Sequence, residues 1–243
     1  MEFTDSRLTV VYDTLNAYAK GTQPDFYLSL ATELRATSIV DLGCGTGLIT
    51  CALAEAGFQM TGIDPAPALL AQARRRDEAL GVRWISGGAE VLGSPDADLA
   101  IMTGHVAQFF LTDEAWLDAL SSLHAALRPG GHLAFESRNP SAREWEDWTP
   151  ENVWRGVDPV AGLIVSWSEV HGVHDGIVSY SIHHVFEDGT VVVSPCALRF
   201  RTVEELEDSL VGASFSVERV FGDWDRGQVS PSAPELIVIA SRV

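Results

Sequence analysis

The sequence is poor in cysteine and contains no long hydrophobic run. Its three cysteines, Cys44, Cys51 and Cys196, are odd in number and lack CxxC spacing, which argues against a disulfide framework or a zinc ribbon. No stretch approaches the ~18 consecutive apolar residues of a membrane span. Residues 1–7 include acids but no apolar core, so we expect no signal peptide. These absences predict a soluble, cytoplasmic protein with no membrane partner.

Positive charge is also scarce. The chain has 16 lysine and arginine residues against 34 aspartate and glutamate residues, which gives a net charge of −18. The acidic excess extends along the whole chain, and no segment is basic. Proteins that bind nucleic acids neutralise phosphates with clustered lysine and arginine. We therefore expect no nucleic acid as a partner, and a small molecule is the better candidate ligand.

The first part of the 243-residue chain alternates between strand and helix signals. Short apolar runs indicate strands at 38–42, 59–64, 82–86, 97–103 and 132–137. Apolar residues at helical spacing indicate helices at 46–56, 65–80 and 113–127. This alternation is typical of a doubly wound α/β sheet whose strands are mostly parallel.

The pattern changes after Arg138. Residues 139–160 are polar and rich in tryptophan, and strand-like runs follow at 163–173, 177–187 and 190–200. Asp-Gly pairs join these runs at 175–176 and 188–189, and Asp-Gly is a strong signal for a tight hairpin. Pro195 places the third run at a sheet edge or a bulge. We therefore predict an antiparallel β insert over 139–200.

The last segment returns to the α/β plan. Thr202 and Glu205 have the spacing of a capping box for a helix over 202–211, and strands follow at 215–221 and 235–240. We expect three parts in the chain: an N-terminal cap with the core over 1–138, a lid over 139–200, and a C-terminal part over 201–243 that completes the core sheet.

The most informative segment is the turn at 40–47, which reads VDLGCGTG between a strand and a helix. An open α/β sheet binds its ligand at such a turn, where backbone N–H groups point at an anionic group. The segment lacks the lysine of a phosphate-binding P-loop, and Leu48 replaces the last glycine of the dinucleotide pattern GxGxxG. Asp41 within the turn would repel a pyrophosphate but attract an ammonium group.

Asp64 ends the next strand. A carboxylate at that place can accept hydrogen bonds from both hydroxyls of a ribose, or it can cap the helix that follows. Glycines alone also fit a tight structural turn. An acid for an amine, glycines for a carboxylate and an acid for a ribose together describe an amino acid joined to a nucleoside without phosphates.

Four motifs in this order resemble those of the class I S-adenosylmethionine-dependent methyltransferases: VDLGCGTG at 40–47, GID ending at Asp64, GGAE at 87–90 and LRPGG at 127–131. The resemblance covers about residues 38–138. It implies a Rossmann-like sheet of seven mostly parallel strands with the antiparallel insert over the active site. It also implies that S-adenosyl-L-methionine is the cofactor.

The resemblance implies a set of cofactor-binding residues: Tyr12, Asp41, Gly43, Cys44, Gly45, Asp64, Pro65, Ala89, Glu90, Thr103 and Gly104. Asp41 would hold the amino group directly or through water, and Asp64 would bind the ribose hydroxyls. Tyr12 and Tyr18 in the N-terminal segment would cover the site, although a packing role suits both equally well.

The family's pattern also assigns the two ends of the cofactor. Ala89 would offer its N–H group to adenine, and Thr103 and Gly104 would face the methionine end. The family often has aspartate where this chain has Gly88. Glu90 or a backbone carbonyl would then replace that contact with the adenine amino group.

The methyl acceptor would lie under the insert. Trp145 and Trp148 are the candidates for the wall of the substrate pocket, with Trp154 and Trp167 as further members. The alternative is that these rings attach the insert to the core.

Two histidines are candidate general bases for an acceptor that must lose a proton. His105 follows the fourth strand at the binding edge of the sheet. His184 lies on the more apolar face of its strand, whereas His183 points to the opposite face. A buried packing role is the alternative for His184. His171 and His174 would point apart, so we predict no metal site.

The sequence therefore favours an S-adenosylmethionine-dependent methyltransferase that acts on a small molecule. The alternative is a non-catalytic S-adenosylmethionine-binding protein, such as a sensor or a partner subunit. A nicotinamide-dependent oxidoreductase is a third hypothesis, and the GxGxG turn with its internal Asp41 argues against it. The acceptor molecule and the oligomeric state stay open.

Overall fold

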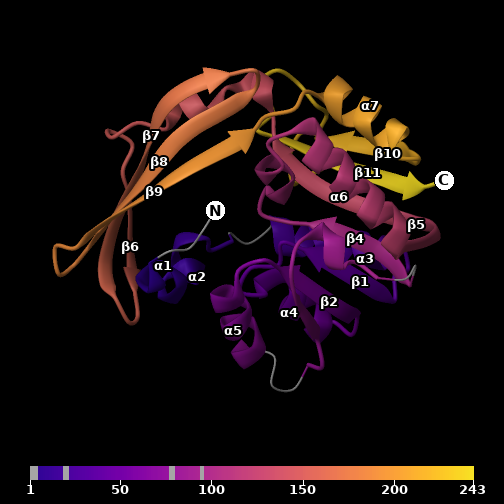
Figure 1. Cartoon of the computed structure of the whole chain (residues 1–243), viewed down its shortest axis with the longest axis horizontal. Helices are drawn as coiled ribbons and strands as arrows, with labels where there is room; N and C mark the ends of the chain where they lie inside the picture. The colour runs from indigo at the N-terminus through magenta and orange to yellow at the C-terminus, as the bar shows by residue number, and fades with distance from the viewer. Residues whose placement is uncertain (1–4, 19–21, 77–79, 94–95) are drawn as a thin grey trace.

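Two β-sheets organise the computed structural model, which describes residues 5–18, 22–76, 80–93 and 96–243 (Figure 1). The larger sheet has seven strands in the order β10-β11-β5-β4-β1-β2-β3. The strands are β1 (Ser38–Leu42), β2 (Gln59–Asp64), β3 (Arg83–Ser86), β4 (Ala97–Met102), β5 (Leu127–Arg138), β10 (Phe215–Phe221) and β11 (Glu235–Arg242). Strands β1 to β5 pair in parallel, and β11 is antiparallel to both β5 and β10. The predicted seven-stranded, mostly parallel sheet is confirmed.

Helices cover both faces of this sheet. Side chains alternate along β4, so that Leu99 and Ile101 belong to one buried cluster while Ala100 and Met102 belong to the other. The first cluster includes residues from α3 (Gln23–Glu33) and α4 (Leu48–Glu55), and the second includes residues from α6 (Asp113–Ala126) and α7 (Val203–Gly212). Apolar faces at helical spacing thus bury the sheet from both sides.

Several predicted boundaries need correction. The helix predicted over 46–56 begins at Leu48, because Gly47 has a left-handed φ of 76°. The helix predicted over 65–80 is α5 (Pro67–Arg76), and 77–79 lie outside the described residues. The capping box predicted for α7 is present, with Thr202 and Glu205 bonded reciprocally. Within the described ranges, no helix is both long enough and apolar enough to cross a membrane.

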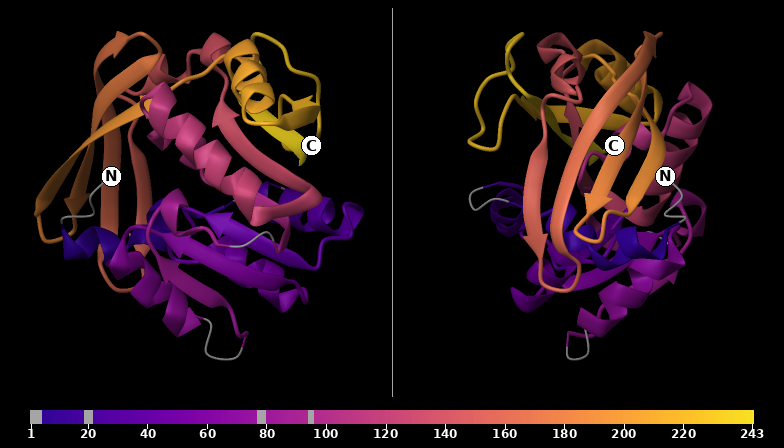
Figure 2. Two further views of the ribbon diagram at one scale, coloured as in Figure 1. Left: turned by 45° about the vertical axis from the view of Figure 1, so that its right-hand side comes forward. Right: turned by 90° about the vertical axis from the view of Figure 1, so that its left-hand side faces the viewer.

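The insert is a four-stranded antiparallel sheet in the order β6-β7-β8-β9. Its strands are β6 (Trp154–Asp158), β7 (Gly162–His174), β8 (Ile177–Phe186) and β9 (Val191–Arg199). The hairpins turn at the two predicted Asp-Gly pairs, and Pro195 lies on the edge strand β9. The sequence did not predict β6. This curved sheet stands beside the carboxyl ends of the parallel strands (Figure 2).

Two short N-terminal helices, α1 (Ser6–Val10) and α2 (Tyr12–Leu15), connect the insert to the core. Leu8 and Val11 pack against apolar residues of β7 and β8. On the other side, Asp13 accepts a hydrogen bond of 2.5 Å from the hydroxyl of Thr46 and forms an ion pair with Arg76 of α5. These helices therefore help to enclose the space between the two sheets.

Candidate functional site

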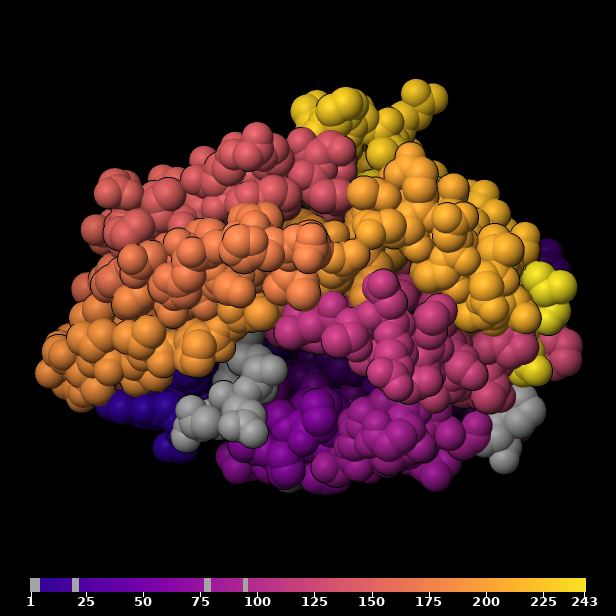
Figure 3. Space-filling model, turned by 45° about the horizontal axis from the view of Figure 1, so that its top comes forward, coloured from indigo at the N-terminus to yellow at the C-terminus, as the bar shows by residue number. Residues whose placement is uncertain are grey.

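A cavity of about 690 Å³ lies between the carboxyl edge of the core sheet and the inner face of the insert. The surface is hollowed between the insert and the core in Figure 3. Its lining includes the N-terminal helices, the glycine turn after β1, the segments that follow β2, β3 and β4, and the insert. The predicted residues on its surface are Tyr12, Gly43, Cys44, Asp64, Pro65, Ala89, Thr103, Gly104, His105 and His184.

The glycine turn has a conformation that other residues would not adopt easily. Gly43 has a φ of 81°, and a Cβ atom there would lie 2.4 Å from Cγ2 of Val106. Gly47 has a φ of 76°, and its Cβ would lie 2.5 Å from the Trp84 ring. Only glycine combines this backbone conformation with such close neighbours. The turn thus brings main-chain atoms, rather than side chains, to the cavity wall.

Asp64 links the turn to the next loop. Its Oδ2 atom accepts a hydrogen bond of 2.9 Å from the Gly45 N–H group, and its Oδ1 atom accepts one of 2.8 Å from the Ala66 N–H group. The side chain is 6% exposed and borders the cavity, and burial raises its pKa. Each carboxylate oxygen has a second lone pair. Asp64 can therefore hold the turn and still accept further bonds from a ligand.

Asp41 lies beneath the turn and does not line the cavity. It is 1% exposed, and its Oδ2 atom accepts a 2.6 Å bond from the Thr50 hydroxyl. Its Oδ1 atom has no hydrogen-bond partner among the described residues. Burial raises the pKa of this carboxyl to about 7. Asp41 is therefore not placed to contact a ligand in the cavity directly. Of the two contacts expected from the sequence, direct or through water, only the one through water fits this position.

The structure also corrects the expectation for Glu90. Its carboxylate turns back and accepts a 2.8 Å hydrogen bond from the N–H group of Gly88, so the side chain does not line the cavity. The cavity wall is formed there by Gly88 and Ala89, which precede and begin a short 3-10 helix over Ala89–Val91.

The loop after β4 is held by a buried carboxyl group that the sequence did not single out. Glu136 of β5 is fully buried, and its Oε1 atom accepts hydrogen bonds from the N–H groups of Gly104 at 2.5 Å and His105 at 3.1 Å. The hydroxyl of Tyr27 donates to its other oxygen. Tyr18 forms a hydrogen bond with Thr103 in the same loop. The sequence signal that could have revealed Glu136 is an acid that directly follows the apolar run 133–135 of the predicted strand.

His105 forms a close pair with another acid that the sequence reasoning missed. Its Nε2 atom lies 2.9 and 3.1 Å from the two carboxyl oxygens of Glu235, the first residue of β11. The side chains are 13% and 11% exposed. Burial lowers the pKa of His105 to about 4 and raises the pKa of Glu235 to about 8, so burial disfavours both charges.

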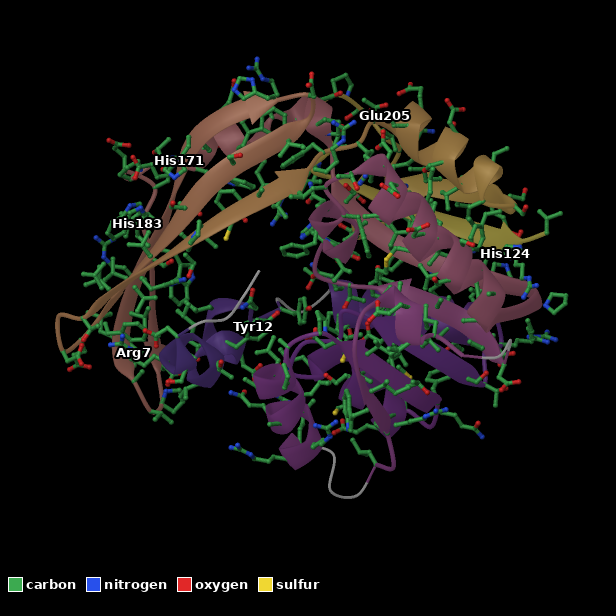
Figure 4. The ribbon with its side chains drawn as sticks, viewed as in Figure 1. Arg7, Tyr12, His124, His171, His183 and Glu205 are labelled. Carbon is green, nitrogen blue, oxygen red and sulfur yellow. The ribbon has the colours of Figure 1, made fainter. Side chains whose placement is uncertain are left out.

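His184 faces the cavity, as the alternation along its strand predicts. It is 6% exposed, and its Nδ1 atom lies 3.1 Å from the hydroxyl oxygen of Ser166 on β7. Burial lowers its pKa to about 4. His183 lies on the outer face of the insert (Figure 4), where its ring stacks on Trp167 at a centroid distance of 4.9 Å.

The two tryptophans predicted for the substrate pocket do not line the cavity. Trp145 packs edge-on against Phe200 at 4.7 Å, and Trp148 lies 4.7 Å from the Tyr180 ring. Both pack against an apolar cluster of β8, β9 and Phe200 that lies wholly within residues 139–200. A residue of the pocket wall needs a ring face that is free to contact the ligand, whereas these two rings pack against aromatic neighbours. Trp154 of β6 lines the cavity instead.

A family model described as "Methyltransferase domain" matches residues 39–131. Demethylmenaquinone methyltransferase of Thermus thermophilus is 37% identical over 110 residues, which are 44% of this chain and 49% of that protein. Glycine/sarcosine N-methyltransferase of Parasynechococcus marenigrum is 27% identical over 238 residues, which are 95% of this chain and 80% of that protein. The match thus spans about half the length of the first relative and most of the second.

The fold has a similar counterpart among solved structures. The crystal structure of an S-adenosylmethionine-dependent methyltransferase from Clostridium acetobutylicum aligns with a TM-score of 0.79 at 16% identity. The alignment covers 97% of this chain and 98% of that one. The likeness therefore includes the insert as well as the core sheet.

Proposed function

Because the chain belongs to the class I S-adenosylmethionine-dependent methyltransferases, we propose that it transfers a methyl group from S-adenosylmethionine to a small molecule held under the insert. The cofactor carries the methyl group on a positively charged sulfur that becomes a neutral thioether. The protein's task is to bind and align the two reactants and to keep water away from them.

The observation that supports this proposal best is the match between the cavity's polar groups and the parts of the cofactor. The glycine turn offers a main-chain surface where a Cβ atom would clash. Asp64 has lone pairs left for the ribose hydroxyls, and the unpaired Oδ1 atom of buried Asp41 suits a positively charged amino group reached through water. Ala89 would meet adenine, and Thr103 and Gly104 would lie toward the methionine end.

The enclosure of the cavity supports a small acceptor. The insert covers one side of the cavity and the N-terminal helices cover another. The cavity volume of about 690 Å³ must therefore hold the cofactor together with its acceptor. The chain's net charge of −18 disfavours an approach by nucleic acid. Polar side chains of the insert, His184 and Ser194 among them, would contact the acceptor, and Trp154 would form part of its wall. The cytoplasmic location stays a prediction from the sequence.

A turnover screen tests the proposal. The protein is incubated with S-adenosylmethionine and a panel of small hydroxyl, amine and thiol compounds, and the S-adenosylhomocysteine released is measured. We expect release that depends on the protein and on at least one acceptor. Tight cofactor binding without turnover on any acceptor would favour a non-catalytic binding protein. Binding of a nicotinamide dinucleotide in place of S-adenosylmethionine would contradict the proposal.

A further inference from the structure

The His105–Glu235 pair lies where the cavity meets the loop after β4. His105 borders the cavity, and its Nε2 atom is directed at the Glu235 carboxyl group. No hydrogen bond to its other ring nitrogen, Nδ1, is found within the described residues. The sheet order brings the pair together, because β11 lies next to β5 and β5 lies next to β4.

The backbone of His105 is held in an uncommon conformation. Its φ of 61° is left-handed, which is unusual for a residue with a side chain. The main-chain bonds to Glu136 at both Gly104 and His105 maintain it. Left-handed residues fixed in this way gather at functional sites, where they aim a side chain.

We propose that His105 and Glu235 form a proton-accepting dyad, with His105 as the base and Glu235 as its positioning residue, and hence that the methyl acceptor is a hydroxyl or ammonium group. The inference rests on the proposed methyltransferase function and narrows its substrate class. An acceptor that carries no removable proton would need no such pair.

The proton balance of the step is simple. The acceptor's oxygen or nitrogen forms a bond to the methyl carbon as the carbon–sulfur bond of the cofactor breaks and leaves its electron pair on sulfur. The acceptor's proton moves to Nδ1 of His105, before attack when the acceptor is an ammonium group, whose nitrogen has no free electron pair, and during attack when it is a hydroxyl. The imidazolium charge is stabilised by the Glu235 carboxylate at Nε2, and the proton passes to solvent after the products leave.

The protonation state of Glu235 decides whether Nδ1 can accept a proton. When Glu235 is protonated it donates to Nε2, so that the neutral ring carries its hydrogen on Nδ1. When Glu235 is ionised it accepts from Nε2–H, and Nδ1 presents a lone pair. Arg138 of β5 lowers the pKa of Glu235 and Glu144 raises it, while the Glu136 carboxyl raises the pKa of His105. With a Glu235 pKa of about 8, the active form appears as the pH rises through about 8.

His184 lacks the corresponding partner. Its Nδ1 atom pairs with the hydroxyl of Ser166 rather than with a carboxyl group. A hydroxyl does not stabilise an imidazolium as a carboxylate does. We therefore assign His184 to hydrogen bonding with the acceptor and not to proton removal.

Nitrogen NMR of the histidine rings in the complex with S-adenosylhomocysteine tests the dyad without a known acceptor. We expect the His105 ring to exchange its Nδ1–H form for its Nε2–H form with a midpoint near pH 8 in the natural protein. The change should disappear in Glu235→Gln and return at a shifted midpoint in Glu235→Asp. His105→Gln identifies the signals. Glu218→Gln is the matched control. Glu218 pairs with His132 at 3.4 Å, and neither residue lines the cavity.

Turnover gives the second measurement, on any hydroxyl or amine compound of the panel that serves as an acceptor. The rate should rise as the pH passes through about 8 and level off above it. Glu235→Gln should lower the rate roughly 10²-fold or more and remove that pH dependence. Glu218→Gln should change neither.

The outcomes separate the dyad from the proposed function. A His105 ring that titrates identically in the natural protein and Glu235→Gln overturns the dyad, and so does normal turnover by Glu235→Gln. Either result leaves the methyltransferase proposal intact as long as S-adenosylhomocysteine binds. Failure of the natural protein to bind S-adenosylhomocysteine overturns the proposed function itself.

Discussion

Replacing Asp64 with alanine separates the structural and the ligand-binding roles of one carboxylate. The two backbone N–H groups of Gly45 and Ala66 lose their acceptor. A lost bond to a charged acceptor costs about 1.5–3 kcal/mol, so the loss of both bonds should lower the free energy of unfolding by roughly 3–6 kcal/mol. At about 2–4 °C per kcal/mol for a chain of this size, the melting temperature should fall clearly.

The affinity for S-adenosylhomocysteine should fall in addition. Each ribose hydroxyl that loses Asp64 costs another ~1.5–3 kcal/mol, which corresponds to roughly 10- to 150-fold in the dissociation constant. Calorimetric titration measures the affinity, and thermal unfolding of the free protein measures the stability. Asp64→Ala should change both.

Asp98→Ala is the matched control. Asp98, the second residue of β4, also accepts two backbone N–H bonds, from Thr37 at 2.6 Å and from Ser38 at 3.0 Å. It lies near the amino end of the strand and does not line the cavity. Its loss should lower the melting temperature to a similar degree and leave the affinity for S-adenosylhomocysteine unchanged. Equal affinity losses in the two variants, or normal affinity in Asp64→Ala, would refute the ribose assignment.

Three further predictions address the turn, the buried acid and the insert. Gly47→Ala should lower both stability and affinity, because its φ of 76° and a Cβ 2.5 Å from Trp84 demand a rearranged turn; thermal unfolding and calorimetry measure this, and a variant as stable as the natural protein would contradict it. Cofactor binding should release protons below pH 7, because burial raises the pKa of Asp41 to about 7 and the ammonium group of the cofactor favours its ionised form. The affinity should therefore fall as the pH falls. Calorimetry in two buffers of different ionisation heat measures the protons released, and no release would place Asp41 away from the ligand. Trp148→Ala should lower the free energy of unfolding by up to about 3 kcal/mol through lost packing on Tyr180, with affinity for S-adenosylhomocysteine unchanged; a large affinity loss with normal stability would return Trp148 to the binding site.

The core of the fold was predictable because its signals are local. Four parallel strands, β1 to β4, were located to within one residue by apolar runs that end in aspartate or are followed by glycine, and the insert was located by its two Asp-Gly turns. The fifth strand was found as well, but β5 begins at Leu127, five residues before its predicted start. Strand alternation also placed His184 rather than His183 on the inner face. The short helices α1 and α2 were not predicted, because five and four residues are too few for a hydrophobic period and their packing depends on distant β7 and β8.

The candidate site was only partly predictable for a related reason. The residues of the turn carry a motif, whereas Glu235 is 130 positions from His105 and meets it only through the order of β11, β5 and β4. Tryptophan content predicted aromatic packing but not its partners, so Trp145 and Trp148 were assigned to the wrong surface. The side chain of Glu90 could have pointed outward or back, and the bond to Gly88 decides this.

A crystal structure with S-adenosylhomocysteine tests the central claim most directly. We predict one bound molecule in the cavity, with its ribose hydroxyls on Asp64, its adenine beside Ala89 and its sulfur directed at the space between His105 and His184. A ligand bound elsewhere, or one whose sulfur points away from the insert, would contradict the account.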